Sequence, residues 1–245
     1  MKSKKTNILQ KDKIQNKVPK FEDITDIKSL IRYIFKGEDF ISHVLFFVVL
    51  LILFKFILLP SVGFVMNTPY PLTAVVSESM EQRMSSNQVC GQRVESDDTR
   101  DFWEICGEYY KEQFQISREE FESFRFSSGF NRGDVMIVYG RAAESIEVGD
   151  VILFKGQDKV TLPDGTQESL FYLNFGPIIH RVVQIEEINN SLYFTTKGDN
   201  NPIVMPKEIR IPQEDVLGTA VVRIPYLGLL NYYFYRFVVA PIRGN

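Results

Sequence analysis

The spacing of apolar residues divides the chain into a membrane-associated N-terminal part and a long region of short strands. Residues 1–20 are polar, lysine-rich and without periodicity, which is typical of a disordered tail. Between Thr25 and Gly37 apolar residues recur at helical spacing, with Thr25 as the expected N-cap and Gly37 as the stop. This pattern predicts an amphipathic helix on the membrane surface, and docking on a partner subunit is the alternative that it leaves open.

A predominantly apolar stretch of 23 residues follows, from Val44 to Met66, with the charged Lys55 near its midpoint. As a helix with roughly 1.5 Å of rise per residue, it is long enough to cross a bilayer. A cleaved signal peptide is disfavoured, because the run is too long and begins too late. Residues 1–43 carry ten basic and six acidic side chains, so the positive excess predicts a cytoplasmic amino terminus. The remainder is then extracytoplasmic, in a single-pass protein of the cell membrane.

Beyond Met66, short apolar runs alternate with turn signals, which predicts a mainly β, antiparallel domain. Asn189-Asn190 and Pro163-Asp164-Gly165 are the expected turns. The predicted strands are Thr73–Val76, Val135–Tyr139, Val151–Phe154, Ile178–Ile188 and Leu192–Thr196.

Residues 81–131 interrupt this β pattern. Nine aromatic and seventeen charged residues make the segment unlike a flexible linker. Apolar residues from Phe102 to Tyr109 recur at helical spacing, and Ser117 begins a capping-box pattern for a second helix. We therefore expect a small helical insertion, serving as a lid, a substrate-docking surface or, the interpretation we favour, structural decoration. Its Cys90 and Cys106 are equally compatible with a disulfide and with two free thiols.

The last segment, 224–245, is aromatic and apolar but is interrupted by polar residues and Pro241. It is too short and too polar for a second span, so we expect an interfacial segment. The predicted parts are a cytoplasmic tail with its amphipathic helix (1–42), a transmembrane helix (43–66), the β domain (67–80 and 132–223), the helical insertion (81–131) and this C-terminal segment.

Three polar positions supply the groups of a serine hydrolase. Ser79 follows an apolar strand, Asp199 lies in a predicted turn, and His180 is one of only two histidines. The other histidine, His43, is at the membrane boundary. An imidazole titrates near neutrality, so His180 is the expected base. No metal cluster, phosphate loop or nucleotide fingerprint is visible in the sequence, and we expect no cofactor.

Five motifs in order resemble type I signal peptidases of the archaeal and endoplasmic-reticulum kind, peptidase family S26B. Bacterial type I signal peptidases have lysine as the base, so His180 points to the archaeal and eukaryotic branch. The resemblance covers residues 44–230, with one interruption at 81–131. The motifs are Ser77-Glu78-Ser79-Met80, Arg132-Gly133-Asp134, Gly149-Asp150, His180-Arg181-Val182 and Lys197-Gly198-Asp199-Asn200.

The resemblance implies that the β domain is catalytic and removes signal peptides from exported preproteins. Ser79 would be the nucleophile and His180 the general base. The Ser77 hydroxyl and the Ser79 backbone N–H would bind the oxyanion, and Met80 would line the mouth of the substrate site. Membrane lipid and the protein-translocation machinery are the further partners that the resemblance implies.

The carboxylate that orients His180 is the point at which the sequence departs from the family pattern. Val204 and Met205 stand where relatives have an aspartate a few residues beyond the Gly-Asp-Asn element. Three arrangements are open: Asp199 orients His180, Glu208 or another carboxylate substitutes, or a serine–histidine dyad works alone. Our prediction takes Asp199 as the third catalytic residue.

Two other functions compete with the peptidase. The first is a catalytically weak or inactive paralogue that binds extended peptides as a membrane adaptor, an interpretation favoured by the missing aspartate and the insertion. The second is a self-cleaving repressor-type protease. That class has a lysine base and a DNA-binding part, and this sequence has neither, so we expect no nucleic-acid partner.

Overall fold

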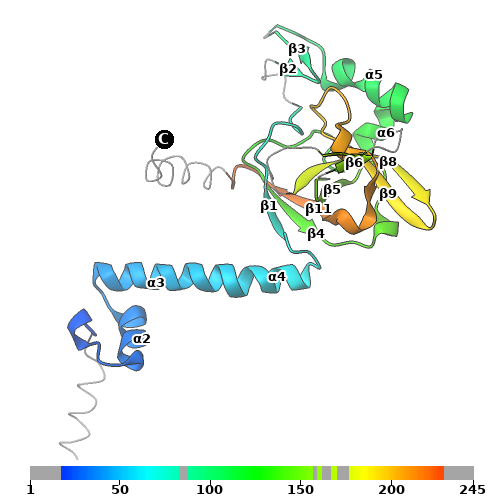
Figure 1. The fold of residues 1–245 in the computed structure, drawn as a ribbon. Helices are drawn as coiled ribbons and strands as arrows, with labels where there is room; N and C mark the ends of the chain where they lie inside the picture. The colour runs from blue at the N-terminus through cyan, green and yellow to red at the C-terminus, as the bar shows by residue number, and fades with distance from the viewer. Residues whose placement is uncertain are drawn as a thin grey trace, which may run out of the picture. The chain divides into compact units, whose positions relative to one another are not determined.

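The computed structural model describes residues 18–82, 88–95, 97–156, 159–161, 167–169 and 177–228 (Figure 1). The chain separates into two compact units, Met1–Val62 and Gly63–Asn245. The predicted tail up to residue 17, the turn at 163–165 and the C-terminal segment from 229 lie outside the described residues.

The first unit is helical. After the short turn η1 (Phe21–Asp23), helix α2 (Ile27–Lys36) begins at Asp26, whose carboxylate accepts the Ser29 N–H at 2.7 Å. The N-cap therefore lies one residue after the predicted Thr25, and α2 ends at Gly37 as predicted. Helix α3 (Phe40–Leu53), the π-helical turn η2 (Phe54–Leu58) and α4 (Leu59–Val65) then follow without a break.

Helices α3 and α4 with η2 form one apolar rod, Phe40–Val65, of 26 residues with a mean hydropathy of 2.7. It is the one helix among the described residues that is long and apolar enough to cross a membrane. It begins a few residues before the predicted span, because Asp39 caps it by accepting the Ser42 N–H at 2.7 Å.

The second unit is built on a curled, antiparallel, seven-stranded sheet, so the predicted mainly β fold is confirmed (Figure 1). In spatial order the strands are β1 (Leu72–Ala74), β4 (Val135–Tyr139), β11 (Val216–Ile224), β5 (Val151–Phe154), β8 (Ile178–Ile188), β9 (Ser191–Lys197) and β10 (Ile211–Pro212). The smaller elements are the hairpins β2 (Gln88–Val89) with β3 (Gln92–Arg93) and β6 (Lys159–Thr161) with β7 (Gln167–Ser169), and the 3₁₀ turns η3 (Ala143–Ser145), η4 (Pro206–Glu208) and η5 (Gln213–Asp215).

Three of the predicted strands coincide with strands of the structure. The bounds of β4, β5 and β8 are those expected, and Asn189 and Asn190 form the tight turn into β9 with φ of 51° and 61°. The central strand β11 was missed. Gly218 within it has a φ of 148°, and the register shifts on both sides of this glycine, so the strand lacks a clean period of two.

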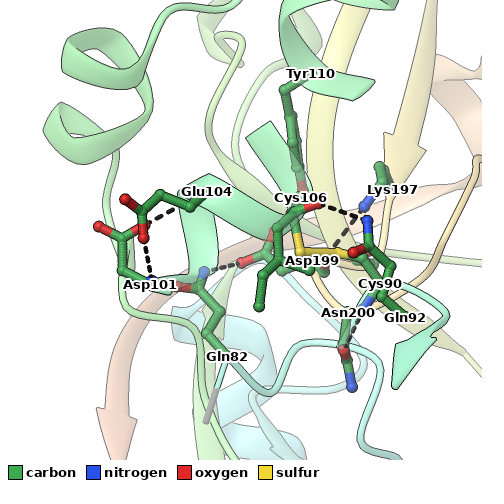
Figure 2. The surroundings of a disulfide bond; sticks show 12 residues. Gln82, Cys90, Gln92, Asp101, Glu104, Cys106, Tyr110, Lys197, Asp199 and Asn200 are labelled. Atoms are coloured by element: carbon green, nitrogen blue, oxygen red, sulfur yellow. Dashed lines mark hydrogen bonds between the residues drawn. A yellow bond between two sulfur atoms is a disulfide. The ribbon is translucent and has the colours of Figure 1, made fainter. Parts of the chain in front are cut away.

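The helical insertion is confirmed and consists of α5 (Phe102–Phe114) and α6 (Arg118–Ser123). The Ser117 hydroxyl accepts the Glu120 N–H at 3.1 Å, as the capping pattern predicted. Rings of Trp103, Tyr110 and Phe121 pack together, with centroids 5.0–6.0 Å apart. A Cys90–Cys106 disulfide ties the β2–β3 hairpin to α5, which decides the alternative that the sequence left open (Figure 2).

Gly149, two residues before β5, should be a glycine at which a methyl group is costly. Its φ is +96°, and a Cβ there would lie 2.2 Å from a ring carbon of Phe124. We expect Gly149→Ala to lower the free energy of unfolding by at least about 2 kcal/mol. Denaturant unfolding of the detergent-solubilised protein measures this. Gly156→Ala is the control, since its nearest contact is a side-chain methyl at 3.1 Å; equal losses in both variants would contradict the prediction.

Candidate active site

The predicted nucleophile lies in a turn directly after β1. Hydrogen bonds from Val75 N–H to the Asp134 carbonyl and from Gly133 N–H to the Val75 carbonyl, both 2.8 Å, hold the chain before this turn. The Arg-Gly-Asp motif thus supports the segment that leads into the serine turn. Ser79 is half-buried, and its Oγ lies 2.9 Å from the Ser77 Oγ.

His180 comes from β8, where it pairs with Ile152 of β5 in the middle of the sheet. Its Nε2 lies 2.7 Å from the Ser79 Oγ, which is hydrogen-bonding distance. The imidazole is 6 % exposed. A base is therefore in contact with the candidate nucleophile, across 101 residues of sequence.

Glu208 is the carboxylate that faces the other nitrogen of His180. Its Oε1 contacts His180 Nδ1, and its Oε2 accepts the Met205 N–H at 3.1 Å. Glu208 is fully buried at the end of η4. One oxygen is thus fixed by the backbone while the other meets the imidazole.

Asp199, which the sequence favoured for that place, is bound elsewhere. Arg181 holds both of its carboxylate oxygens, with Nε–Oδ1 at 2.9 Å and Nη2–Oδ2 at 2.7 Å. Tyr110 Oη donates to Oδ1 at 3.2 Å and Gln82 Nε2 donates to Oδ2 at 2.7 Å (Figure 2). Both oxygens are therefore engaged on the side of the insertion, away from His180.

The Arg181 guanidinium is completely buried and also donates to backbone carbonyls of the insertion and of the turn before β5. It binds the carbonyls of Arg125, Phe126 and Gly149 at 2.8–3.0 Å. Burial opposes its charge, but the Asp199 carboxylate outweighs this and raises the pKa of Arg181. The group stays cationic and fixes the loop that contains Asp199.

Lys197 is a second buried cation beside this pair. Its Nζ donates to the carbonyls of Gly198 and Asp199, both at 3.1 Å, and lies 4.6 Å from the centre of the Tyr110 ring. Burial lowers the pKa of Lys197 to about 8, although nearby carboxylates act in the opposite direction.

The loop after Lys197 passes close to the reacting groups. A Cβ on Gly198 would lie 2.9 Å from both His180 Nε2 and the Ser79 carbonyl oxygen. Glycine is needed here because the loop backbone contacts the serine and the histidine directly.

Of the predicted site residues, the structure brings Ser77, Ser79 and His180 together. Met80 is buried under the site in a core cluster, 1 % exposed, instead of at its mouth. Asp199 lies in the neighbouring ion pair. The sequence offered Glu208 only as one alternative to Asp199, because Glu208 is not part of a recognisable sequence motif.

A hydroxyl, an imidazole and a carboxylate in this order can activate an oxygen nucleophile. The carboxylate fixes the tautomer and orientation of the histidine, and the histidine removes the proton of the hydroxyl. The described residues therefore contain the groups needed for acyl transfer.

Part of the chain is similar in sequence to catalytic subunits of signal peptidase complexes. No known family model matches the chain. It is 26 % identical over 126 residues to the rat signal peptidase complex catalytic subunit SEC11C, covering 47 % of this chain and 58 % of the relative. It is 32 % identical over 101 residues to the fission yeast subunit sec11, covering 39 % and 44 %. An uncharacterized protein of Methanocaldococcus jannaschii is 44 % identical over 59 residues, covering 22 % and 29 %.

The chain is thus a distant homologue of curated signal peptidase catalytic subunits, and the resemblance noted from the motifs is confirmed. It spans about half the length of the curated relatives it matches.

Lys197 should make the stability of the protein depend on pH. Its pKa is about 8 in the folded chain and near 10.5 in the unfolded chain, so unfolding between these values takes up a proton. The free energy of unfolding should therefore rise from pH 8 towards pH 10. Above pH 10 the buried Tyr110, whose pKa is raised by burial and by Asp199, reverses the trend. Denaturant unfolding at pH 8 and pH 9.5 measures the slope, and an undiminished rise in Lys197→Met would contradict this assignment.

Proposed function

We propose that the chain is a membrane-anchored serine endopeptidase that removes signal peptides from exported preproteins. The observation that carries this proposal is the 2.7 Å contact between Ser79 Oγ and His180 Nε2. The homology to signal peptidase catalytic subunits supports the choice of substrate.

In the proposed reaction His180 Nε2 takes the Ser79 proton as Oγ attacks the scissile carbonyl carbon. The oxyanion that forms is stabilised by the Ser77 hydroxyl and the Ser79 backbone N–H. His180 then gives its proton to the leaving amine, and water, activated by the same imidazole, releases the acyl group. The proximity of the Ser77 and Ser79 hydroxyls, 2.9 Å apart, is compatible with this role for Ser77.

We assign the orienting role to Glu208 in place of Asp199. Glu208 is in contact with His180 Nδ1, and the Met205 N–H fixes its second oxygen. Asp199 is engaged by Arg181, and its role is to hold the loop beside the serine. A glutamate has one more methylene than an aspartate, so it reaches the imidazole from η4, later in the chain than the family position.

The substrate would bind as an extended peptide along β1. This strand is at one edge of the seven-stranded sheet and pairs with β4 alone among the described strands. A free strand edge can accept a further strand through backbone hydrogen bonds. Small residues beside the scissile bond would fit shallow apolar pockets there.

The rod Phe40–Val65 would anchor the enzyme in the membrane with its amino terminus in the cytoplasm. Such an anchor keeps the catalytic unit at the membrane surface, where signal peptides emerge. Membrane lipid and the translocation machinery are the partners that this placement implies.

Cleavage of a synthetic preprotein by the detergent-solubilised protein tests the proposed function. We expect cleavage after a small residue, and a loss of at least about 10³-fold in rate in Ser79→Ala and in His180→Ala, because each removes one of the two reacting groups. Ser128→Ala, an exposed serine of the insertion, is the matched control and should cut normally.

A wild type that binds the preprotein without cutting it, under conditions where an active relative cuts, would contradict the proposal. It would favour a peptide-binding adaptor instead. Wild-type cleavage that survives Ser79→Ala would equally exclude the assigned nucleophile.

A further inference from the structure

We propose that the Cys90–Cys106 disulfide positions Ser79 for reaction and that Asn200 is the residue that connects them. The proposal rests on the function proposed above. In this proposal the insertion holds the serine turn in position, and it does so only while Cys90 and Cys106 are oxidised to the disulfide.

Asn200 is attached to the nucleophile turn by two hydrogen bonds. Its backbone N–H donates to the Ser79 carbonyl at 2.7 Å, and its side-chain Nδ2 donates to the Glu78 carbonyl at 3.2 Å. Both bonds act on the backbone of the serine turn. Asn200 is therefore one of the residues that set where the Ser79 hydroxyl lies relative to His180.

The remaining polar atom of the Asn200 side chain is bound by the insertion. Its Oδ1 accepts the Cys90 N–H at 3.0 Å (Figure 2). The amide of Asn200 thus bridges the insertion and the serine turn, with one end on Cys90 and the other on Glu78. A displacement of Cys90 is therefore passed to the turn through the Asn200 side-chain amide alone.

The disulfide is the covalent restraint on Cys90. Each strand of the β2–β3 hairpin has two residues, and Val89 is the one buried side chain in these strands. A two-stranded hairpin this short is at best marginally stable by itself. The bond to Cys106 fixes it to α5, where Cys106 is 3 % exposed within the aromatic core of the insertion.

Helix α5 is in turn held against the same loop. Tyr110 Oη donates to Asp199 at 3.2 Å, and Tyr109 Oη accepts the Val204 N–H at 3.2 Å. The disulfide therefore closes a ring of contacts that runs from α5 to the hairpin, to Asn200 and back to α5 through Asp199. Without the disulfide, the hairpin is still attached to α5 by Val89 in the shared core and by the hydrogen bond from Gln92 Nε2 to the Ile105 carbonyl at 3.1 Å. Asn200 is then bound to a hairpin that has lost its covalent attachment.

Reduction of the disulfide is a two-electron reaction. A dithiol reductant supplies two electrons and two protons, the Sγ–Sγ bond breaks into two thiols, and the reductant becomes a cyclic disulfide. Cys90 and Cys106 are the only cysteines of the chain, so any effect of the reductant on the protein arises from this bond.

The test compares cleavage of the synthetic preprotein by the oxidised and the dithiol-reduced full chain, with the thiols counted by mass spectrometry. We expect reduction to lower kcat by roughly tenfold to a hundredfold with little change in KM, because small displacements of a reacting group cost rate. Reoxidation should restore the rate. Equal rates in the two states would overturn the proposal.

A double-mutant cycle separates positioning from general stabilisation. Asn200→Ala should lower kcat to a similar extent and should make the enzyme insensitive to the dithiol, because the link is already cut. Additive losses would overturn the role of Asn200. Arg93→Ala, an exposed position of the same hairpin, should keep the full response to reduction.

Hydrogen exchange gives a readout that does not depend on activity. Reduction should speed exchange of the Asn200 amide, whose partner is the Ser79 carbonyl, without loss of protection in β5 and β8. If the oxidised wild type fails to cut, the proposed peptidase function fails while this measurement still decides the link. Unchanged exchange at Asn200 would overturn it.

Discussion

The buried ion pair between Arg181 and Asp199 is the interaction on which the arrangement of this protein depends. A guanidinium taken out of water is costly unless every N–H finds an acceptor. Here Arg181 donates five hydrogen bonds, two to Asp199 and three to backbone carbonyls. Those acceptors belong to the turn before β5, the end of the insertion and the loop after β9. One side chain thus brings three separate parts of the chain to the active site.

The ion pair also explains why Asp199 and Glu208 contact different residues. His180 and Arg181 are consecutive in β8, so their side chains leave the strand on opposite faces. Asp199 is bound to the arginine face, and a different group has to meet the histidine. Glu208, presented by the 3₁₀ turn before β10, occupies that place. Glu208 contacts His180 and Asp199 contacts Arg181, on opposite faces of β8.

The sequence predicts most of the sheet and two of the three site groups, for identifiable reasons. Strands such as β4 and β5 have uninterrupted apolar runs bounded by turn residues, and Ser79 and His180 lie in motifs with a fixed order. Strand β11 escapes because Gly218 and its bulges break the alternation. The role of Glu208 is not predictable from the sequence, because its contact with His180 forms only when η4 packs against β9. The insertion looked like decoration, since no local pattern shows that Tyr110 and the disulfide reach the site loop.

We infer that Glu208 orients His180 while Asp199 holds the loop beside the serine. To test this, kcat and the free energy of unfolding are measured side by side for Glu208→Gln and Asp199→Asn. We expect Glu208→Gln to lower kcat by about 10²-fold or more in a stably folded protein. Asp199→Asn should instead lower the free energy of unfolding by about 3–5 kcal/mol, because a buried arginine loses its counter-charge. A stable, catalytically dead Asp199→Asn beside an active Glu208→Gln would contradict these two assignments.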